Sequence, residues 1–271
     1  MIRTRLLSFL VVILALGSTT VYGQDIPTVY ASVACFKSLN GDFTDFHEEV
    51  ANKYFDALIE EKVITDWALY QVLYPNGEDC DCHYRGVLQM SSLASLERLN
   101  SAEKSMELLK KLYPGQDLDA LMGRYMEAAT MMNEQVYLLR NMAAGEGQER
   151  PRIISVNYMN VPETSYTEYA ALEDEVWKPM HQQRIENGKM LGWQLWERVL
   201  PGGIGMPGNF ATVDAWGSWT NMAMPEDMDA IAFKVHPNRD MDGFFASSVA
   251  ARELHTSETW ELLMAFTPAK K

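Results

Sequence analysis

The 271-residue sequence has few cysteines, few basic residues and none of the common nucleotide-binding or hydrolase motifs. Three cysteines are too few for a disulfide-rich scaffold. Lysine and arginine number 23 against 37 acidic residues, giving a net charge of −14, which argues against binding to nucleic acids or to anionic membranes. No Gly-x-Ser-x-Gly, P-loop or His-Glu-x-x-His pattern occurs, so the sequence gives no support to those enzyme classes.

Long apolar runs are also absent, except at the N-terminus. Residues 1–23 contain Arg3 and Arg5, then an apolar segment at 6–17, then small or polar residues. This order is typical of a secretory signal peptide, and the apolar segment is shorter than the ~20 residues of a membrane span. We expect cleavage before Gln24 and a periplasmic or secreted protein, without stable membrane insertion after signal cleavage.

The remainder of the chain contains two copies of one unit. Residues 48–89 align with residues 174–215 without a gap at an offset of 126, with nine identities in 42 positions. Downstream, residues 134–139 match residues 258–263 at an offset of 124. Matched tryptophan, proline and glycine residues indicate an internal duplication. The expected boundaries are a signal peptide at 1–23, a first repeat at 24–144, a linker at 145–150 and a second repeat at 151–271.

Each copy is predicted to run strand, helix, strand, strand, helix, strand, which is the ferredoxin-like βαββαβ order. Both faces of the predicted strands carry apolar residues, so the sheet needs cover on both sides. We therefore expect an α+β fold in which two tandem ferredoxin-like units pack sheet-to-sheet as an intrachain barrel, in a monomer with an internal pseudo-dimer. The predicted strands are 28–37, 64–74, 83–90, 134–141, 153–160, 190–200, 209–219 and 258–266, and the predicted helices are 42–62, 93–132 with a break at Pro114-Gly115, 166–187 and a segment near 240–254.

This order, with Val176-Trp-Lys-Pro-Met-His181 followed by Gly192-Trp193, resembles the dimeric α+β barrel superfamily in its tandemly fused, single-chain form. The likeness is strongest to exported, uncharacterised bacterial members, and it covers nearly all of the chain after residue 23. The superfamily includes cofactor-free oxygenases, isomerases, cyclases and haem-binding enzymes, so the resemblance implies a fold and not one activity. The cofactor is unknown from the sequence, and we expect none.

A histidine on the helix of the second copy is the first candidate for chemistry. Pro179 lies inside a helical pattern, where it removes a backbone hydrogen bond and is expected to kink the helix. Trp177 and His181 are four residues apart and share one helix face. His181 is therefore interpreted as a general acid or base tuned toward neutral pH, as a haem or metal ligand, or as a structural histidine bonded to a carbonyl group.

Polar residues on the predicted strands of the second copy are the next candidates. Thr212 and Asp214 share one face of a strand with two aromatic residues, an arrangement that suits a small-molecule cavity with a few orienting groups. Water or an interface could equally satisfy these groups. The candidate catalytic residues are His181 and Asp214, and the candidate substrate-binding residues are Trp177, Asn157, Gln194, Trp196 and Thr212.

The cysteines admit three interpretations. Cys80-Asp-Cys-His83 holds two thiols and an imidazole, which are metal-ligand types at a spacing that is not standard for zinc. In the predicted topology Cys35 lies close to Cys82 or Cys80, so a disulfide is the second interpretation. Free thiols are the third. We assign no metal site, and we name Cys35 and Cys82 as the candidate pair.

Three functions are compatible with these patterns. The first is the binding or conversion of a small hydrophobic or aromatic molecule in the barrel cavity, by cofactor-free proton transfer or oxygen chemistry. The second is a non-catalytic periplasmic module that binds a protein or a glycan, for which a solidly filled barrel would be the sign. The third is a haem or metal protein with His181 as the ligand.

Overall fold

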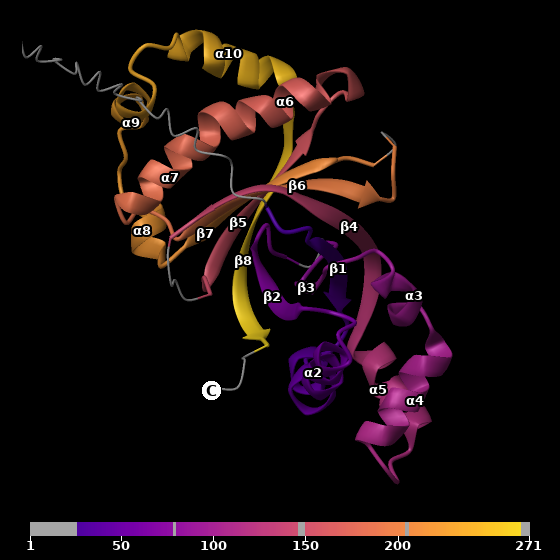
Figure 1. Cartoon of the computed structure of the whole chain (residues 1–271). Coiled ribbons are helices and arrows are strands. Elements are labelled where there is room, and N and C mark those ends of the chain that lie inside the picture. Colours follow the sequence, from indigo (N-terminus) through magenta and orange to yellow (C-terminus); the bar gives the residue numbers. More distant parts are fainter. Residues whose placement is uncertain (1–25, 78–79, 146–149, 204–205, 267–271) are drawn as a thin grey trace, which may run out of the picture.

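The structure is a computed structural model that describes residues 26–77, 80–145, 150–203 and 206–266. The expected signal peptide and most of the expected linker lie outside these residues. The described chain forms an α+β fold in which a closed antiparallel barrel is covered by helices (Figure 1).

The barrel has eight strands in the described residues, and each repeat contributes four of them. Around the barrel they follow the order β1-β3-β2-β8-β5-β7-β6-β4. The repeats join twice, because β2 pairs with β8 and β4 pairs with β6. The two sheets therefore share a continuous hydrogen-bonded wall. The strands are β1 (Tyr30–Ser38), β2 (Asp66–Tyr74), β3 (Tyr84–Met90), β4 (Ala129–Ala144), β5 (Ile153–Asn160), β6 (Gly192–Leu200), β7 (Phe210–Trp216) and β8 (Glu253–Ala265).

Helices lie outside the barrel, and those of the two repeats lie on opposite sides of it (Figure 1). None of the helices in the described segments has the length and hydropathy needed to cross a membrane. The helical segments of the first repeat are α1 (Phe43–Phe46), the π-helix η1 (His47–Ala51), α2 (Asn52–Glu60), α3 (Ser95–Leu99), α4 (Ala102–Leu112) and α5 (Leu118–Ala128). Those of the second repeat are η2 (Glu163–Ser165), α6 (Tyr166–Leu172), the π-helix η3 (Glu173–Trp177), α7 (Lys178–Glu186), α8 (Trp219–Ala223), α9 (Met228–Val235) and α10 (Met241–Ala251).

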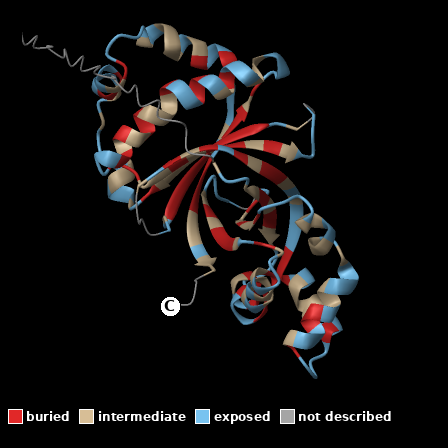
Figure 2. Cartoon of the chain, in the orientation of Figure 1, coloured by how far each residue is buried: buried red, intermediate tan, exposed pale blue. Residues whose placement is uncertain are grey.

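Side chains on each strand alternate between the barrel interior and the helix layer, as the period of two requires. On β6, Trp193 and Leu195 pack in the core beneath the helices, whereas Trp196 packs in the core inside the barrel. Buried residues accordingly run along the strands and along the inner faces of the helices (Figure 2). The protein has separate cores inside the barrel and under each helix layer.

Some element boundaries differ from the sequence prediction. Residues 129–132 belong to β4 and not to a helix, and β8 begins at Glu253 within a segment predicted to be helical. Both starts lie on the two longest strands, where sheet pairing outweighs the helix propensity of residues such as alanine, methionine and leucine. The short helices α8 and α9 were not predicted, because each has fewer than three turns of periodic sequence.

The match between residues 134–139 and 258–263 at an offset of 124 is wrong by one residue. The ladders pair Ala34 with Glu134 and Asn157 with Ser257, so Glu134 corresponds to Ser257 at an offset of 123. A shift of one residue moves a strand side chain to the opposite face of the sheet. Glu134 accordingly bonds Ser32 outside the barrel, whereas Glu258 is bonded to Arg85 inside it.

The helix that carries Pro179 is π-helical just before that residue. The segment Glu173–Trp177 is a π-helix, and α7 begins at Lys178. The first repeat has the same π-helical segment at His47–Ala51, where Lys53 occupies the position of the proline. Pro179 is therefore not the cause of the irregularity. The shared segment turns His47 and Glu173, which are equivalent in the two repeats, into the buried layer.

A disulfide joins Cys35 on β1 to Cys82, which lies just before β3. The Sγ atom of Cys82 is thus unavailable as a metal ligand, and Cys80 is a free thiol. We expect the denatured, unreduced protein to react with one equivalent of a thiol reagent and the reduced protein with three. Mass spectrometry should show the gain of two hydrogen atoms on reduction. Three reactive thiols before reduction would contradict the bond, and a Cys80→Ser variant should lower each count by one.

Candidate functional site

A polar group lies on the helix-facing side of the second repeat's sheet. Asn157 on β5 pairs in register with Thr212 on β7, and Asp214 follows two residues later on the same face. The Asn157 side-chain amide donates to Thr212 Oγ1 and to Asp214 Oδ2, each at 3.3 Å. Ser257 on β8 donates to Asn157 Oδ1 at 2.7 Å. Three strands therefore hold these side chains in one hydrogen-bonded group.

Helix side chains close over this group. The ring of His181 on α7 stacks on Trp193 of β6, with 5.0 Å between ring centroids and 13° between ring planes. Trp177 lies against the same imidazole, with 6.2 Å between centroids, and its indole donates to Ser248 of α10 at 3.0 Å. The helices and the sheet enclose a pocket of about 250 Å³, which we call the helix-covered pocket; it is lined by Asn157, Met159, Glu173, Trp177, His181, Trp193, Thr212, Asp214, Arg252 and Leu254.

Two carboxyl groups face this pocket, the buried Glu173 and the half-buried Asp214. Burial raises the pKa of Asp214 to about 6, while Arg184 and the Asn157 amide oppose the increase. Burial also raises the pKa of Glu173 to about 7; the nearby Arg252 guanidinium opposes the increase, and the charge of Asp214 adds to it. Asp214 Oδ1 is buried without a hydrogen-bond partner among the described residues. Displaced carboxyl pKa values in a concave site are typical of acid–base chemistry.

One cation completes the pocket. Arg252 precedes β8, and its Nη1 atom lies 3.4 Å from Met159 Sδ. Its Nε atom is buried without a partner, and no acid of the described residues lies within ion-pair distance of the guanidinium. An Arg with unused donors is suited to bind a carboxylate or another anion.

His181 is neutral in this setting. Burial and the neighbouring Arg184 guanidinium lower the pKa of His181 to about 3, far below the neutral range that the sequence led us to expect. Arg184 Nη1 lies 3.0 Å from His181 Nδ1. A guanidinium only donates hydrogen bonds, so Nδ1 accepts and the ring proton resides on Nε2. His181 therefore offers a hydrogen-bond donor and a stacking surface, and is too weak a base to take up a proton near pH 7.

The same hydrogen bond bears on haem or metal ligation. A metal-bound histidine donates its second ring N–H to an acceptor and ligates through the lone pair on the other nitrogen. At His181 the neighbour of Nδ1 is a donor, which forces the opposite arrangement. The groups around His181 therefore do not fit a haem or metal ligand. Elsewhere in the described residues, no three His, Cys, Asp or Glu side chains are grouped as metal ligands.

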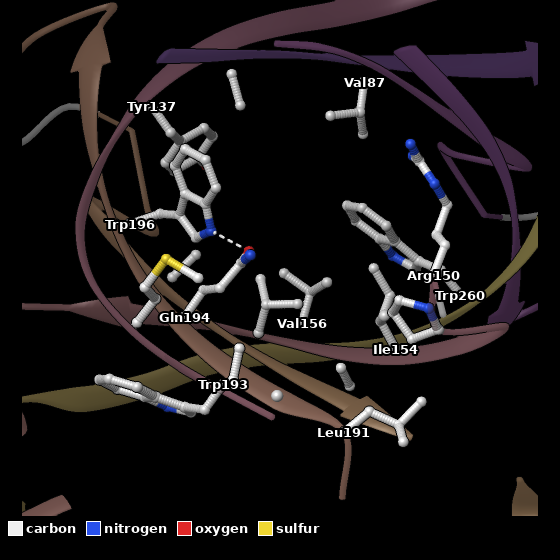
Figure 3. A pocket seen from close by; sticks show the side chains of 18 of the residues that line it. Val87, Tyr137, Arg150, Ile154, Val156, Leu191, Trp193, Gln194, Trp196 and Trp260 are labelled. Carbon is white, nitrogen blue, oxygen red and sulfur yellow. Dashed lines mark hydrogen bonds between the residues drawn. The ribbon is translucent and has the colours of Figure 1, made fainter. Parts of the chain in front are cut away.

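The barrel interior is a second cavity. It has a volume of about 460 Å³ and an apolar, aromatic wall contributed by both repeats (Figure 3). Gln194 and Trp196 lie here, and the Trp196 indole donates to Gln194 Oε1 at 2.9 Å. The ring of Trp193 points away from this cavity, on the other side of the strand (Figure 3). The barrel is thus not solidly filled by side chains.

The seven candidate residues consequently divide between two faces of the sheet. The expectation that all would serve the barrel cavity is wrong for five of them, because strand alternation and helix packing turn them outward. Those in the helix-covered pocket are Asn157, Trp177, His181, Thr212 and Asp214, and those in the barrel are Gln194 and Trp196.

Sequence reasoning missed two ionisable residues of the pocket, Glu173 and Arg252. Glu173 is four residues after Tyr169 and three before Val176, so it is an acid on the buried stripe of the helix, which is a readable signal. Arg252 gave no such signal, because it lies where a helix was predicted to continue.

Comparison with known proteins gives the fold. No protein-family profile matches the chain, and no curated protein matches its sequence. A Fusobacterium nucleatum protein provisionally named a monooxygenase has 8% identity and a TM-score of 0.52, over 89% of this chain and 94% of its own. An anthrone oxidase-like protein has 11% identity and a TM-score of 0.50 over the same shares.

A protein provisionally named chlorite dismutase TA0507 is similar over 88% of this chain and 95% of its own, with 10% identity and a TM-score of 0.49. Identities this low establish a shared fold and no shared activity. The monooxygenase-named and anthrone oxidase-like structures, together with the closed barrel of two βαββαβ repeats, show that this chain has the fold of the dimeric α+β barrel proteins, with both halves in one chain.

Proposed function

We propose that the protein converts a small aromatic carbonyl compound by proton transfer in the helix-covered pocket, without a bound cofactor. One observation carries this proposal: the buried Glu173 carboxyl and the half-buried Asp214 carboxyl, whose Oδ1 atom is buried, line a pocket that also holds an arginine without an ion-pair partner. Burying such groups costs stability unless a ligand or a reaction uses them. The cavity chemistry thus favours catalysis over a purely structural role.

The two acids have different roles near pH 7. Asp214, with a pKa of about 6, is mostly ionised and serves as the base. Glu173, with a pKa of about 7, is protonated in about half of the molecules and serves as the acid. Pairs of carboxyl groups held in different protonation states are the usual basis of acid–base catalysis in one pocket.

The remaining lining residues define the substrate class. Trp177 and His181 line the pocket with aromatic side chains, which suits a planar ring. Arg252 suits a carboxylate group on the same substrate. An aromatic 2-oxo acid has both features, and its carbonyl group acidifies the adjacent C–H bond.

The proposed step balances without a co-reactant. Asp214 removes a proton from the carbon next to the carbonyl group, and the C–H electrons form a carbon–carbon double bond. The carbonyl π electrons move to oxygen, which takes the proton of Glu173. The product is the enol, and reversal after exchange of the Asp214 proton with solvent returns a labelled substrate.

We also propose that the protein acts as an exported monomer. The Cys35–Cys82 disulfide supports an oxidising compartment. Closure of the barrel within one chain supports a monomer, because the strand edges that a partner would cover are already paired.

Deuterium exchange into phenylpyruvate tests the proposed reaction. In deuterated buffer the protein is expected to accelerate loss of the methylene proton signal, with a bell-shaped pH profile whose limbs lie near pH 6 and pH 7. Asp214→Asn should lower the rate by about 100-fold or more, because it removes the base. Glu60→Gln, at an exposed position of α2, is the matched control. An exchange rate equal to that of buffer, or one unaffected by Asp214→Asn, would refute the assignment.

A further inference from the structure

The barrel cavity is a second enclosed space, separated from the helix-covered pocket by the sheet itself. Its wall combines aromatic side chains from both repeats, including Tyr70, Tyr137, Trp196 and Trp260. Small residues leave space for this cavity, since Ala31 on β1 and Ala211 and Ala215 on β7 occupy interior positions. Eight-stranded barrels are either filled by their own side chains or hold one small ligand.

The charges at the cavity are balanced. Asp66 and Arg150 are charged side chains of its lining, and Arg150 Nη2 lies 2.6 and 2.8 Å from the two Asp66 carboxylate oxygens. Figure 3 shows Arg150 at one side of the cavity. Deeper in the barrel, Arg85 and Glu258 are also paired, at 2.6 Å. With both charges of the lining paired, the cavity is suited to a neutral ligand.

The Gln194 side-chain amide has unused donors inside the cavity. The Trp196 indole N–H is a donor only, so the Gln194 atom that it contacts at 2.9 Å is the amide oxygen. This fixes the side-chain orientation and leaves the Gln194 NH₂ group without an acceptor among the described residues. The amide end of Gln194 lies at the cavity, close to the Trp196 ring (Figure 3). A ligand with a carbonyl oxygen would accept from it.

We propose that the barrel cavity binds a neutral aromatic molecule that carries a carbonyl oxygen, with its ring among the interior tryptophans and its oxygen on the Gln194 amide. This site is independent of the proposed reaction. Its ligand differs in class, because the helix-covered pocket holds an unpaired arginine and selects an anion.

Three naphthalenes of matched size test the proposal by calorimetric titration: 2-acetylnaphthalene, 2-ethylnaphthalene and 2-naphthoate. The ketone is expected to bind with one-site stoichiometry, about five- to tenfold more tightly than the ethyl compound, which lacks the acceptor. The anion is expected to bind most weakly. Equal affinities for the three compounds, or no saturable binding of the ketone, would overturn the proposal.

Variants locate the bound ketone. Gln194→Leu should remove the preference for the ketone over the ethyl compound and leave binding of the ethyl compound unchanged, because only the donor is lost. Ala215→Leu should weaken binding of both compounds by occupying the cavity. Asp214→Asn should leave the ketone affinity unchanged, because that side chain faces the other side of the sheet. The inference would be contradicted if Asp214→Asn lost binding of the ketone. It would also be contradicted if Gln194→Leu and Ala215→Leu both bound the ketone as tightly as the parent does, because the ligand would then lie elsewhere.

Discussion

The Arg85→Met variant is expected to lose about 3–5 kcal/mol of unfolding free energy, because it leaves the Glu258 carboxylate buried without its partner. Arg85 bonds both oxygens of Glu258, at 2.6 and 3.1 Å, and the Trp260 indole donates to the same carboxylate at 2.7 Å. The two charged side chains are only 10% and 11% exposed. Urea unfolding at neutral pH measures the loss.

Two further variants separate burial from charge. The double variant Arg85→Met/Glu258→Met should recover most of the lost stability, because it removes both charges together. Arg124→Met breaks a surface pair between side chains that are 37% and 60% exposed, Arg124 and Glu49, and should leave the unfolding free energy nearly unchanged. If the Arg85→Met variant unfolded at the same urea concentration as the parent, the Glu258 carboxylate would not depend on Arg85 for its stabilisation, and the prediction would be wrong.

The Glu173→Gln variant is expected to be more stable than the parent by about 3 kcal/mol at pH 8, since a raised carboxyl pKa of about 7 measures the cost of ionising the buried group. The ordinary pKa of this group is 4.5. The folded parent therefore binds the proton more tightly than the unfolded chain, and its stability falls as the pH rises from about 4.5 to 7. The amide cannot ionise and escapes this loss.

The pH dependence makes this prediction specific. The advantage of Glu173→Gln should shrink toward zero as the pH is lowered through 4.5, where the parent carboxyl is neutral in both states. Buried neutral histidines such as His47 and His181 destabilise the protein in acid, but they do so equally in parent and variant. Glu60→Gln should show no such pH-dependent gain. An unchanged difference between pH 4.5 and pH 8 would mean that Glu173 is not buried as a titrating acid.

Long, periodic elements were predictable from the sequence, whereas the short helices and the starts of the two longest strands were not. β5 was predicted with the bounds that the structure has, because its apolar run ends in turn residues on both sides. The starts of β4 and β8 were missed, because partners distant in the sequence extend those strands. The sequence alignment matched Glu134 with Glu258, one residue away from its true equivalent, Ser257. This error has the same origin, since only the pairing of the strands shows which residues are equivalent in the two repeats.

The sequence predicted which residues of the second repeat lie near one another in the candidate site, but it did not predict on which side of the sheet that site lies. His181 and Asp214 do share one pocket, because helix spacing and strand alternation are local rules. The side of the sheet on which that pocket lies depends on how the two repeats close the barrel, which no local pattern records. The pKa of His181 likewise depends on Arg184, a neighbour one turn later whose donor role becomes visible only with the hydrogen bond in place.

Barrel closure across the repeats has a consequence for how the chain is made. β2 and β4 are the outer strands of the first repeat, and their free edges are covered by β8 and β6. A ribosome completes the first repeat before either covering strand exists, and β8 is the last element of the described residues. Until then the nascent chain exposes two strand edges and one face of an aromatic sheet, which are the features that drive aggregation. Chaperones that bind the incomplete chain should therefore raise the yield of folded protein without raising the stability of the finished fold.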